Sequence, residues 1–256
     1  QRGKTMKDEL KVLCVGNSFS VDALFYFSRM TEAAGLEVDT FNLYIGGCSL
    51  RQHANNLETG AQSYACYLNG EATQRMASIA EALQEENWDI ITVQQASHDS
   101  GIPESYEPYG TNLINYVRKN APRAKIWFHK TWAYEHGSNH PEFPRYDCDQ
   151  IKMYRAISTA VTEFAEKHTL PVIPAGDVVQ ALRQLPEFDY LNGGLSLCGD
   201  GFHMSRTYGR YAVAATWFEM LTGESILENS FMPEETDEAL IKKVKQVVHG
   251  FCAGLK

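Results

Sequence analysis

The stretch Lys11-Val12-Leu13-Cys14-Val15-Gly16 decides the fold class of this chain. It is a short, almost wholly apolar run that stops at a glycine, which is typical of a buried strand. An amphipathic segment follows from Val21 to Ala34, with apolar residues at helical spacing and Gly35 as a stop signal. A buried strand that leads into an amphipathic helix is the repeating unit of a parallel α/β sheet.

The same alternation continues along the rest of the chain. Further strands are predicted at residues 38–45, 89–93, 125–128 and 171–174, and further helices at 71–86, 106–120, 146–168, 205–221 and 234–251. The sequence therefore predicts an α/β protein, a three-layer α/β/α sandwich with a five-stranded, mainly parallel doubly wound sheet. No Pro/Gly/Ser linker separates two cores, so we expect an N-terminal tether at residues 1–10 and a single domain at residues 11–256.

The composition excludes some classes of partner. The 256 residues include 23 Lys and Arg against 32 Asp and Glu, a net charge of −9. Nucleic-acid binding needs clustered cations, and acids lie just upstream of the densest basic stretch, Lys242-Lys243-Val244-Lys245, so no nucleic acid is expected. No run of 18 apolar residues occurs, so no membrane insertion is expected. Because the chain begins at Gln1, we expect an extracytoplasmic protein after signal-peptide removal, with the cytoplasm as the alternative.

The cysteines and histidines do not predict a metal or cofactor site. The six cysteines show no C-x-x-C spacing, and Cys14 lies inside the first predicted strand as an expected buried thiol. The sequence leaves open whether other cysteines pair. His129, His136 and His140 match no compact zinc motif, so no metal and no cofactor are expected.

The segment Gly16-Asn17-Ser18-Phe19-Ser20 occupies the loop after the first strand. In a parallel α/β sheet, ligands bind at the carboxyl ends of the strands. A serine between a strand and a helix can act as a nucleophile and donate its own N–H to an oxyanion. The alternative is a simple helix cap, for which Ser and Asn are the usual residues. The segment fits neither G-x-S-x-G nor a P-loop.

A second polar motif, Asp200-Gly201-Phe202-His203, precedes the predicted helix at residues 205–221. An aspartate three residues before a histidine can hold the imidazole Nδ1–H and leave Nε2 free to take a proton from a hydroxyl. The alternative is a loop aspartate that caps a turn.

The chain order Ser18 … Asp200-x-x-His203 resembles the SGNH, or GDSL-type, hydrolase superfamily. The resemblance runs from Lys11 to about Leu221 and is to a poorly characterised branch. It implies a flavodoxin-like SGNH fold and a serine esterase in which Ser18 is the nucleophile, His203 the general base and Asp200 its orienting acid. Asn17 stands where the superfamily has the Asp of its Gly-Asp-Ser block.

The resemblance also implies an oxyanion hole. In that superfamily the nucleophile's N–H and a glycine N–H act as donors, which here correspond to Ser18 and to Gly47 in Gly46-Gly47-Cys48-Ser49. The third donor is normally an Asn side chain in a Gly-x-Asn-Asp block, but this chain has Val93-Gln94-Gln95-Ala96-Ser97. A glutamine amide can donate in the same way. Neighbours on a strand face opposite sides, so Gln94 and Gln95 both stay candidates.

The segment from His129 to His136 is polar and aromatic. Trp132 and Tyr134 are predicted to form a substrate-binding wall, with Asn17 as a further contact, and packing of the rings into the core is the alternative. The predicted function is hydrolysis of a small acyl ester, acetyl above all, on a small molecule or glycan. A non-catalytic carbohydrate-binding protein with the same fold is the alternative. Hydrolysis of a phosphate or sulfate ester is disfavoured because no Arg clamp is evident, and the −9 charge disfavours a strongly anionic substrate. The oligomeric state is left open.

Overall fold

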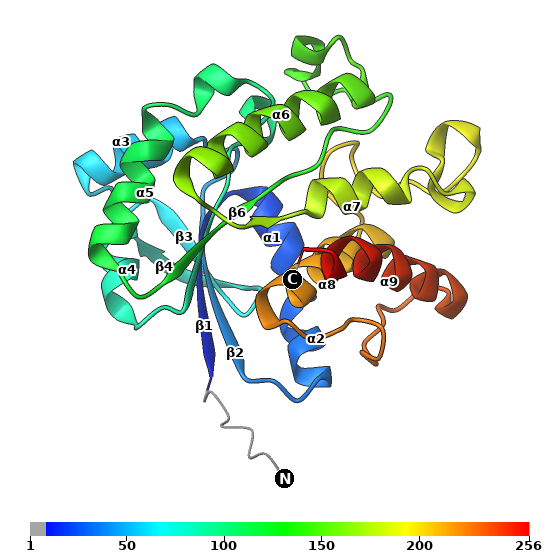
Figure 1. Ribbon diagram of the computed structural model, residues 1–256, viewed down its shortest axis with the longest axis horizontal. Coiled ribbons are helices and arrows are strands. Elements are labelled where there is room, and N and C mark those ends of the chain that lie inside the picture. The colour runs from blue at the N-terminus through cyan, green and yellow to red at the C-terminus, as the bar shows by residue number, and fades with distance from the viewer. Residues whose placement is uncertain (1–8, 256) are drawn as a thin grey trace.

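The structure is a computed structural model, which describes residues 9–255. A sheet lies at its centre (Figure 1). The strands of this sheet follow the order β4-β3-β2-β1-β5-β6-β7. The parallel strands are β1 (Leu10–Gly16), β2 (Val38–Tyr44), β5 (Ile90–Val93), β6 (Lys125–His129) and β7 (Val172–Ile173). An antiparallel pair, β3 (Tyr64–Leu68) and β4 (Glu71–Ala77), extends the β2 edge. The predicted α/β sandwich is confirmed, but the sheet has seven strands rather than five.

Helices cover both faces of this sheet (Figure 1). One face carries α3 (Leu50–Thr59), α4 (Ile79–Glu85), α5 (Tyr109–Asn120) and α6 (Gln150–His168). The other carries α1 (Ser18–Leu24), α2 (Phe27–Ala33), α7 (Ala175–Leu182), α8 (Tyr208–Thr222) and α9 (Glu238–Ala253). Helix α8 packs against α1, α2, α7 and α9, which explains why it is buried on nearly every side. No helix within residues 9–255 is long and apolar enough to cross a bilayer.

The prediction of one helix over residues 71–86 is wrong, because this segment contains both β4 and α4. Asn69 and Gly70 have φ values of 49° and 83°, as a two-residue hairpin turn requires, so β4 returns antiparallel to β3. Ser78 then caps α4 in a capping box with Glu81.

Other predicted boundaries also differ from the structure. The predicted helix at 21–34 is split into α1 and α2 at Phe25–Tyr26, and α3, α7 and β3 were not predicted. The predicted tether lies largely outside the described residues, since residues 1–8 are not described, and β1 already begins at Leu10.

The strand order places the loop after β1 at a special point of the sheet. β1 lies between β2 and β5. From β1 the chain adds β2, β3 and β4 on one side of it, and then β5, β6 and β7 on the other side. Such a switch point opens a crevice at the carboxyl ends of the strands. Gly16 fits there because a Cβ at this position would lie 2.0 Å from Ser20 Oγ. The next residues therefore turn tightly into α1 and carry Ser18 into the crevice.

Candidate active site

The three predicted catalytic residues lie in hydrogen-bond contact. Ser18 is the first residue of α1, and its Oγ lies 2.9 Å from His203 Nε2, across 185 positions of sequence. His203 Nδ1 lies 2.7 Å from Asp200 Oδ2. This is the geometry of a nucleophile, a base and the carboxylate that orients the base.

The loop that carries Asp200 and His203 is organised by the aspartate itself. Asp200 Oδ1 accepts the backbone N–H groups of His203 at 2.7 Å and Phe202 at 3.1 Å. Burial alone would raise the pKa of Asp200, but these hydrogen bonds, led by the one with the His203 side chain, hold it below its usual value. Asp200 is therefore ionised at neutral pH, as an orienting acid must be.

Trp132 does not form part of a substrate-binding wall, contrary to the prediction. Its side chain is 0% exposed, its ring stacks on Phe19 at 4.2 Å, and its Nε1–H donates to the Phe202 carbonyl at 2.7 Å. Phe19 follows Ser18, and Phe202 precedes His203. Trp132 therefore supports the positions of both Ser18 and His203 through their chain neighbours.

We expect Trp132→Phe to slow any reaction that depends on His203, and by more than the loss of one hydrogen bond would suggest. Phenylalanine keeps an aromatic ring on Phe19 but leaves the Phe202 carbonyl without its donor, at a cost of about 1–3 kcal/mol. We predict a lower thermal midpoint and a kcat reduced by about tenfold through misplacement of His203. Unchanged kcat with a lowered midpoint would show that Trp132 acts on stability alone.

Asn17 is a structural cap rather than the predicted substrate contact, since it is 1% exposed. Its Nδ2 donates to the carbonyls of Cys48 at 3.2 Å and Gln95 at 3.4 Å. Its Oδ1 accepts the N–H of Phe19 at 3.0 Å and the Gln94 amide at 2.6 Å. Asn17 thus ties the start of α1 to the loops after β2 and β5.

This pattern predicts that Asn17→Asp destabilises the fold, although aspartate is the residue that the resembled superfamily has there. One carboxylate oxygen would face two carbonyl oxygens in a buried place, which raises the pKa of the new carboxyl in the folded state. Because the folded-state pKa exceeds the unfolded one, the variant loses stability as pH rises from about 4 to 7, reaching about 3 kcal/mol. Chemical denaturation at several pH values measures this, and a loss that is constant with pH would contradict it.

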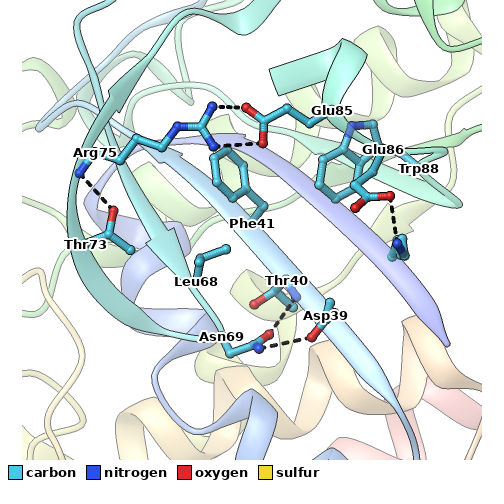
Figure 2. Close-up of a pocket in the computed structure, with 11 residues that line it drawn as sticks. Asp39, Thr40, Phe41, Leu68, Asn69, Thr73, Arg75, Glu85, Glu86 and Trp88 are labelled. Carbon is cyan, nitrogen blue, oxygen red and sulfur yellow. Dashed lines mark hydrogen bonds and ion pairs between the residues drawn. The ribbon is translucent and has the colours of Figure 1, made fainter. Parts of the chain in front are cut away.

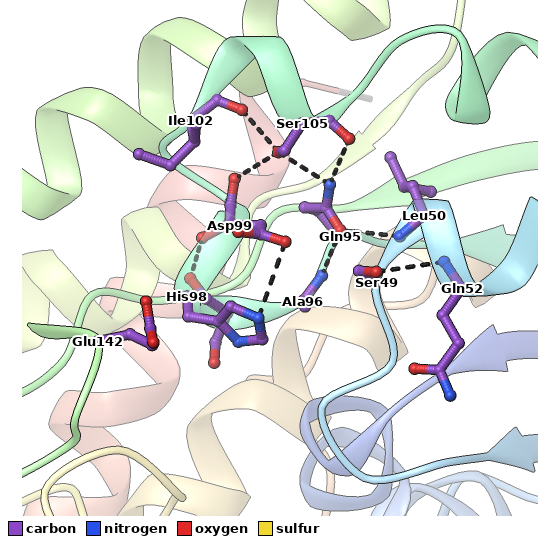
Figure 3. Close-up of polar contacts among 12 residues, drawn as sticks. Ser49, Leu50, Gln52, Gln95, Ala96, His98, Asp99, Ile102, Ser105 and Glu142 are labelled. Carbon is purple, nitrogen blue, oxygen red and sulfur yellow. Dashed lines mark hydrogen bonds and ion pairs between the residues drawn. The ribbon is translucent and has the colours of Figure 1, made fainter. Parts of the chain in front are cut away.

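Neither glutamine serves as the predicted oxyanion donor. Gln94 bridges Asn17 to His129, whose Nδ1 lies 2.7 Å from Gln94 Oε1. The Gln95 side chain lies between α3 and Ser105 (Figure 3). Its Oε1 accepts the N–H of Leu50 at 2.9 Å, and its Nε2 donates to Ser105 Oγ at 3.0 Å. Both glutamines are 1% exposed, and their amide groups are used in hydrogen bonds that connect neighbouring loops.

The two predicted backbone donors, unlike the two glutamine amides, are not used in hydrogen bonds among residues 9–255. The N–H groups of Ser18 and Gly47 make no hydrogen bond within the part of the chain that the structure describes. Gly47 lies in an exposed turn with φ of 62°, and the Asn17 bond to Cys48 holds that turn beside the nucleophile loop. Both N–H groups therefore stay candidate oxyanion donors.

Tyr134 is also buried, at 0% exposed, which contradicts the predicted wall. Its hydroxyl lies 2.8 Å from Ser97 Oγ and 3.3 Å from His140 Nε2. The His140 ring in turn packs on Phe202 and against His98. Within residues 9–255, no group of three or more His, Cys, Asp or Glu side chains is arranged to hold a metal ion.

Ser18, Asp200 and His203 open into a pocket of about 380 Å³. The pocket is lined by Ser18, Val21, Asp22, Tyr44, Tyr67, Gly199, Asp200, His203, Met204, Ser205, Arg206 and Arg210. Tyr44 and Tyr67 form the aromatic part of the wall and were not among the predicted site residues. Tyr44 ends the strand before the Gly46-Gly47 turn, and this position at a strand's carboxyl end was the available signal. Arg206 and Arg210 follow the Asp200–His203 motif by three and seven residues, which was the signal for them.

Comparison with solved structures identifies the fold. A putative SGNH hydrolase from Slackia heliotrinireducens has a TM-score of 0.58 at 20% identity, over 83% of this chain and 99% of that one. An acetyl-xylooligosaccharide esterase from Geobacillus stearothermophilus has a TM-score of 0.51 at 14% identity, over 82% and 93% of the two chains. These likenesses show the SGNH hydrolase fold.

A nearer likeness is to a DUF4886 family protein from Bacteroides uniformis, with a TM-score of 0.88 at 38% identity over 95% of this chain and 94% of that one. The family model described as "Domain of unknown function (DUF4886)" matches residues 11–249. No protein with a curated description matches. This chain therefore belongs to the DUF4886 family, and it has the SGNH hydrolase fold.

Proposed function

We propose that this protein is a serine esterase that removes a small acyl group, acetyl above all, from a carbohydrate. The observation that carries the proposal is the 2.9 Å contact between Ser18 Oγ and His203 Nε2, with Asp200 Oδ2 2.7 Å from the other ring nitrogen. This arrangement supports catalysis over the alternative of a binding protein, because binding alone needs no base on a serine hydroxyl.

The first half of the reaction forms an acyl-enzyme. Ser18 Oγ attacks the ester carbonyl carbon while His203 Nε2 takes the hydroxyl proton, and Asp200 stabilises the resulting imidazolium. The N–H groups of Ser18 and Gly47 receive the oxyanion. The tetrahedral intermediate then breaks its bond to the sugar oxygen, and His203 returns the proton to that oxygen.

The second half regenerates the enzyme. Water attacks the acyl carbon and gives a proton to His203, and the bond to Ser18 Oγ breaks as the serine recovers that proton. The products are the free sugar hydroxyl and the carboxylic acid.

The choice of an acetylated sugar has two supports. The pocket, at about 380 Å³ and partly open, suits a sugar with a small acyl group better than a long lipid chain. A protein with the same fold is an acetyl-xylooligosaccharide esterase.

Hydrolysis of p-nitrophenyl acetate tests the esterase chemistry, and acetate release from O-acetylated xylooligosaccharides and glycosides tests the sugar preference. We expect turnover of the nitrophenyl ester, with acetyl preferred to octanoyl. Absence of turnover in folded protein would contradict the proposal, and a preference for octanoyl would contradict its acyl specificity.

A further inference from the structure

Two tyrosines form an aromatic wall of the catalytic pocket. Tyr44 comes from the end of β2 and Tyr67 from β3, and their rings meet edge to face with centroids 5.5 Å apart. Both side chains are half-buried, so part of each ring faces the pocket. An edge-to-face pair is a rigid apolar surface with polar tips, which suits the face of a sugar ring.

The carboxylates of this pocket are already partnered. Asp22 lies 2.9 Å from Arg210, and its other oxygen accepts the Met204 N–H at 2.8 Å. Asp22 is only 2% exposed, so this ion pair belongs to the wall rather than to the open space. Asp200 is held by the ring and backbone of His203.

Arg206 differs from these groups, because its guanidinium forms no ion pair or hydrogen bond within residues 9–255. It is exposed at the pocket and lies 5.7 Å over the Phe25 ring. Its backbone is fixed, since the Arg206 carbonyl accepts the Tyr26 hydroxyl. The catalytic pocket of a chain with net charge −9 therefore presents an open cation.

A larger pocket at the opposite, amino ends of β1 and β2 provides a contrast. It measures about 440 Å³, and Figure 2 shows its charged side chains bound to one another. Arg75 pairs with Glu85, and Lys11 lies 2.7 Å from Glu86. Both cations that line this pocket are paired with carboxylates, whereas Arg206 in the catalytic pocket is not paired within the described part of the chain.

We propose, as a refinement that rests on the esterase function, that the sugar part of the substrate carries an anionic group. Arg206 binds this carboxylate or sulfate through its planar fork of N–H donors, while the sugar ring packs against Tyr44 and Tyr67. The net charge of −9 alone predicted the opposite preference, but the local charge at the pocket, rather than the total, acts on a bound substrate.

The test is binding of deacetylated products, because it does not depend on turnover. Calorimetry compares methyl glucuronoside and methyl glucoside 6-sulfate with neutral methyl glucoside, using the full chain, Arg206→Gln and Arg29→Gln. Arg29 is the matched control, since it is an exposed arginine over the Tyr26 ring and does not line the pocket. p-Nitrophenyl acetate hydrolysis by the unaltered protein is measured in parallel.

We expect at least one anionic sugar to bind about fivefold more tightly than the neutral one, as a charge-assisted contact near the surface implies. Arg206→Gln should bring that ratio to about one, and Arg29→Gln should keep it. The tighter of the two anionic sugars identifies carboxylate or sulfate as the group. Equal binding of all three sugars, or a preference that survives Arg206→Gln, would overturn the inference. Absence of p-nitrophenyl acetate turnover together with an Arg206-dependent preference would instead overturn only the esterase function.

Discussion

Ser18→Ala is expected to reduce kcat for ester hydrolysis by a factor on the order of 10⁴ or more, without loss of the fold. The Ser18 hydroxyl contacts His203, whereas the side chains of Asn17 and Ser20 cap α1. Removal of the Ser18 hydroxyl therefore leaves the start of the helix intact. The remaining rate comes from oxyanion binding and substrate positioning alone. Initial rates on p-nitrophenyl acetate, with circular dichroism and a thermal midpoint for the variant, measure both parts.

The matched control for this change is Ser28→Ala. Ser28 lies on α2, where its hydroxyl donates to the Asn69 carbonyl at 3.2 Å, outside the residues that line the pocket. We expect wild-type rates from it. If Ser18→Ala keeps full activity, the protein has another nucleophile and the mechanism is wrong.

His203→Ala and Asp200→Asn are expected to differ from each other in magnitude. Removing the imidazole abolishes both proton transfers, at a cost on the order of 10⁵ in kcat. Asp200→Asn keeps an oxygen that can accept the N–H groups of Phe202 and His203, so the loop holds its shape. The variant loses the charge that stabilises the imidazolium, at a cost on the order of 10³.

The double variant separates a triad from two independent contributions. Because Asp200 acts only through His203, the double variant should have nearly the same kcat as His203→Ala alone. Additive losses would show that Asp200 has a separate role, and an Asp200→Asn variant slower than His203→Ala would contradict its assignment as an orienting residue.

The parts of the fold that local patterns determine could be predicted from the sequence. The apolar runs at residues 11–15, 89–93 and 125–128 correspond to β1, β5 and β6, because strands buried on both faces must be apolar throughout. β3 and β4 are partly exposed and lack such a run. Met76, Ile79 and Leu83 lie at helical spacing and so predict a helix, whereas Asn69-Gly70 is the dipeptide of the hairpin turn that the structure contains.

The candidate site shows the same division. Ser18, Asp200 and His203, which the structure brings into contact, could be predicted because the proposed chemistry requires those residue types in short motifs. Trp132 and Tyr134 have the composition of a sugar-binding wall, yet both are buried, since composition does not say which way a loop faces. Gln94 and Gln95 likewise have the right donor groups, but tertiary contacts use both amides for structure.

The most direct test of the central claim is covalent labelling by an active-site-directed phosphonate, followed by intact-mass and peptide analysis. A phosphonate reacts with a serine only when a base activates its hydroxyl, so the label reports the 2.9 Å contact between Ser18 and His203 chemically. We predict one phosphonyl group per chain, on Ser18, and none in Ser18→Ala or His203→Ala. An unlabelled wild-type chain, or a label on another residue that persists in Ser18→Ala, would contradict the account.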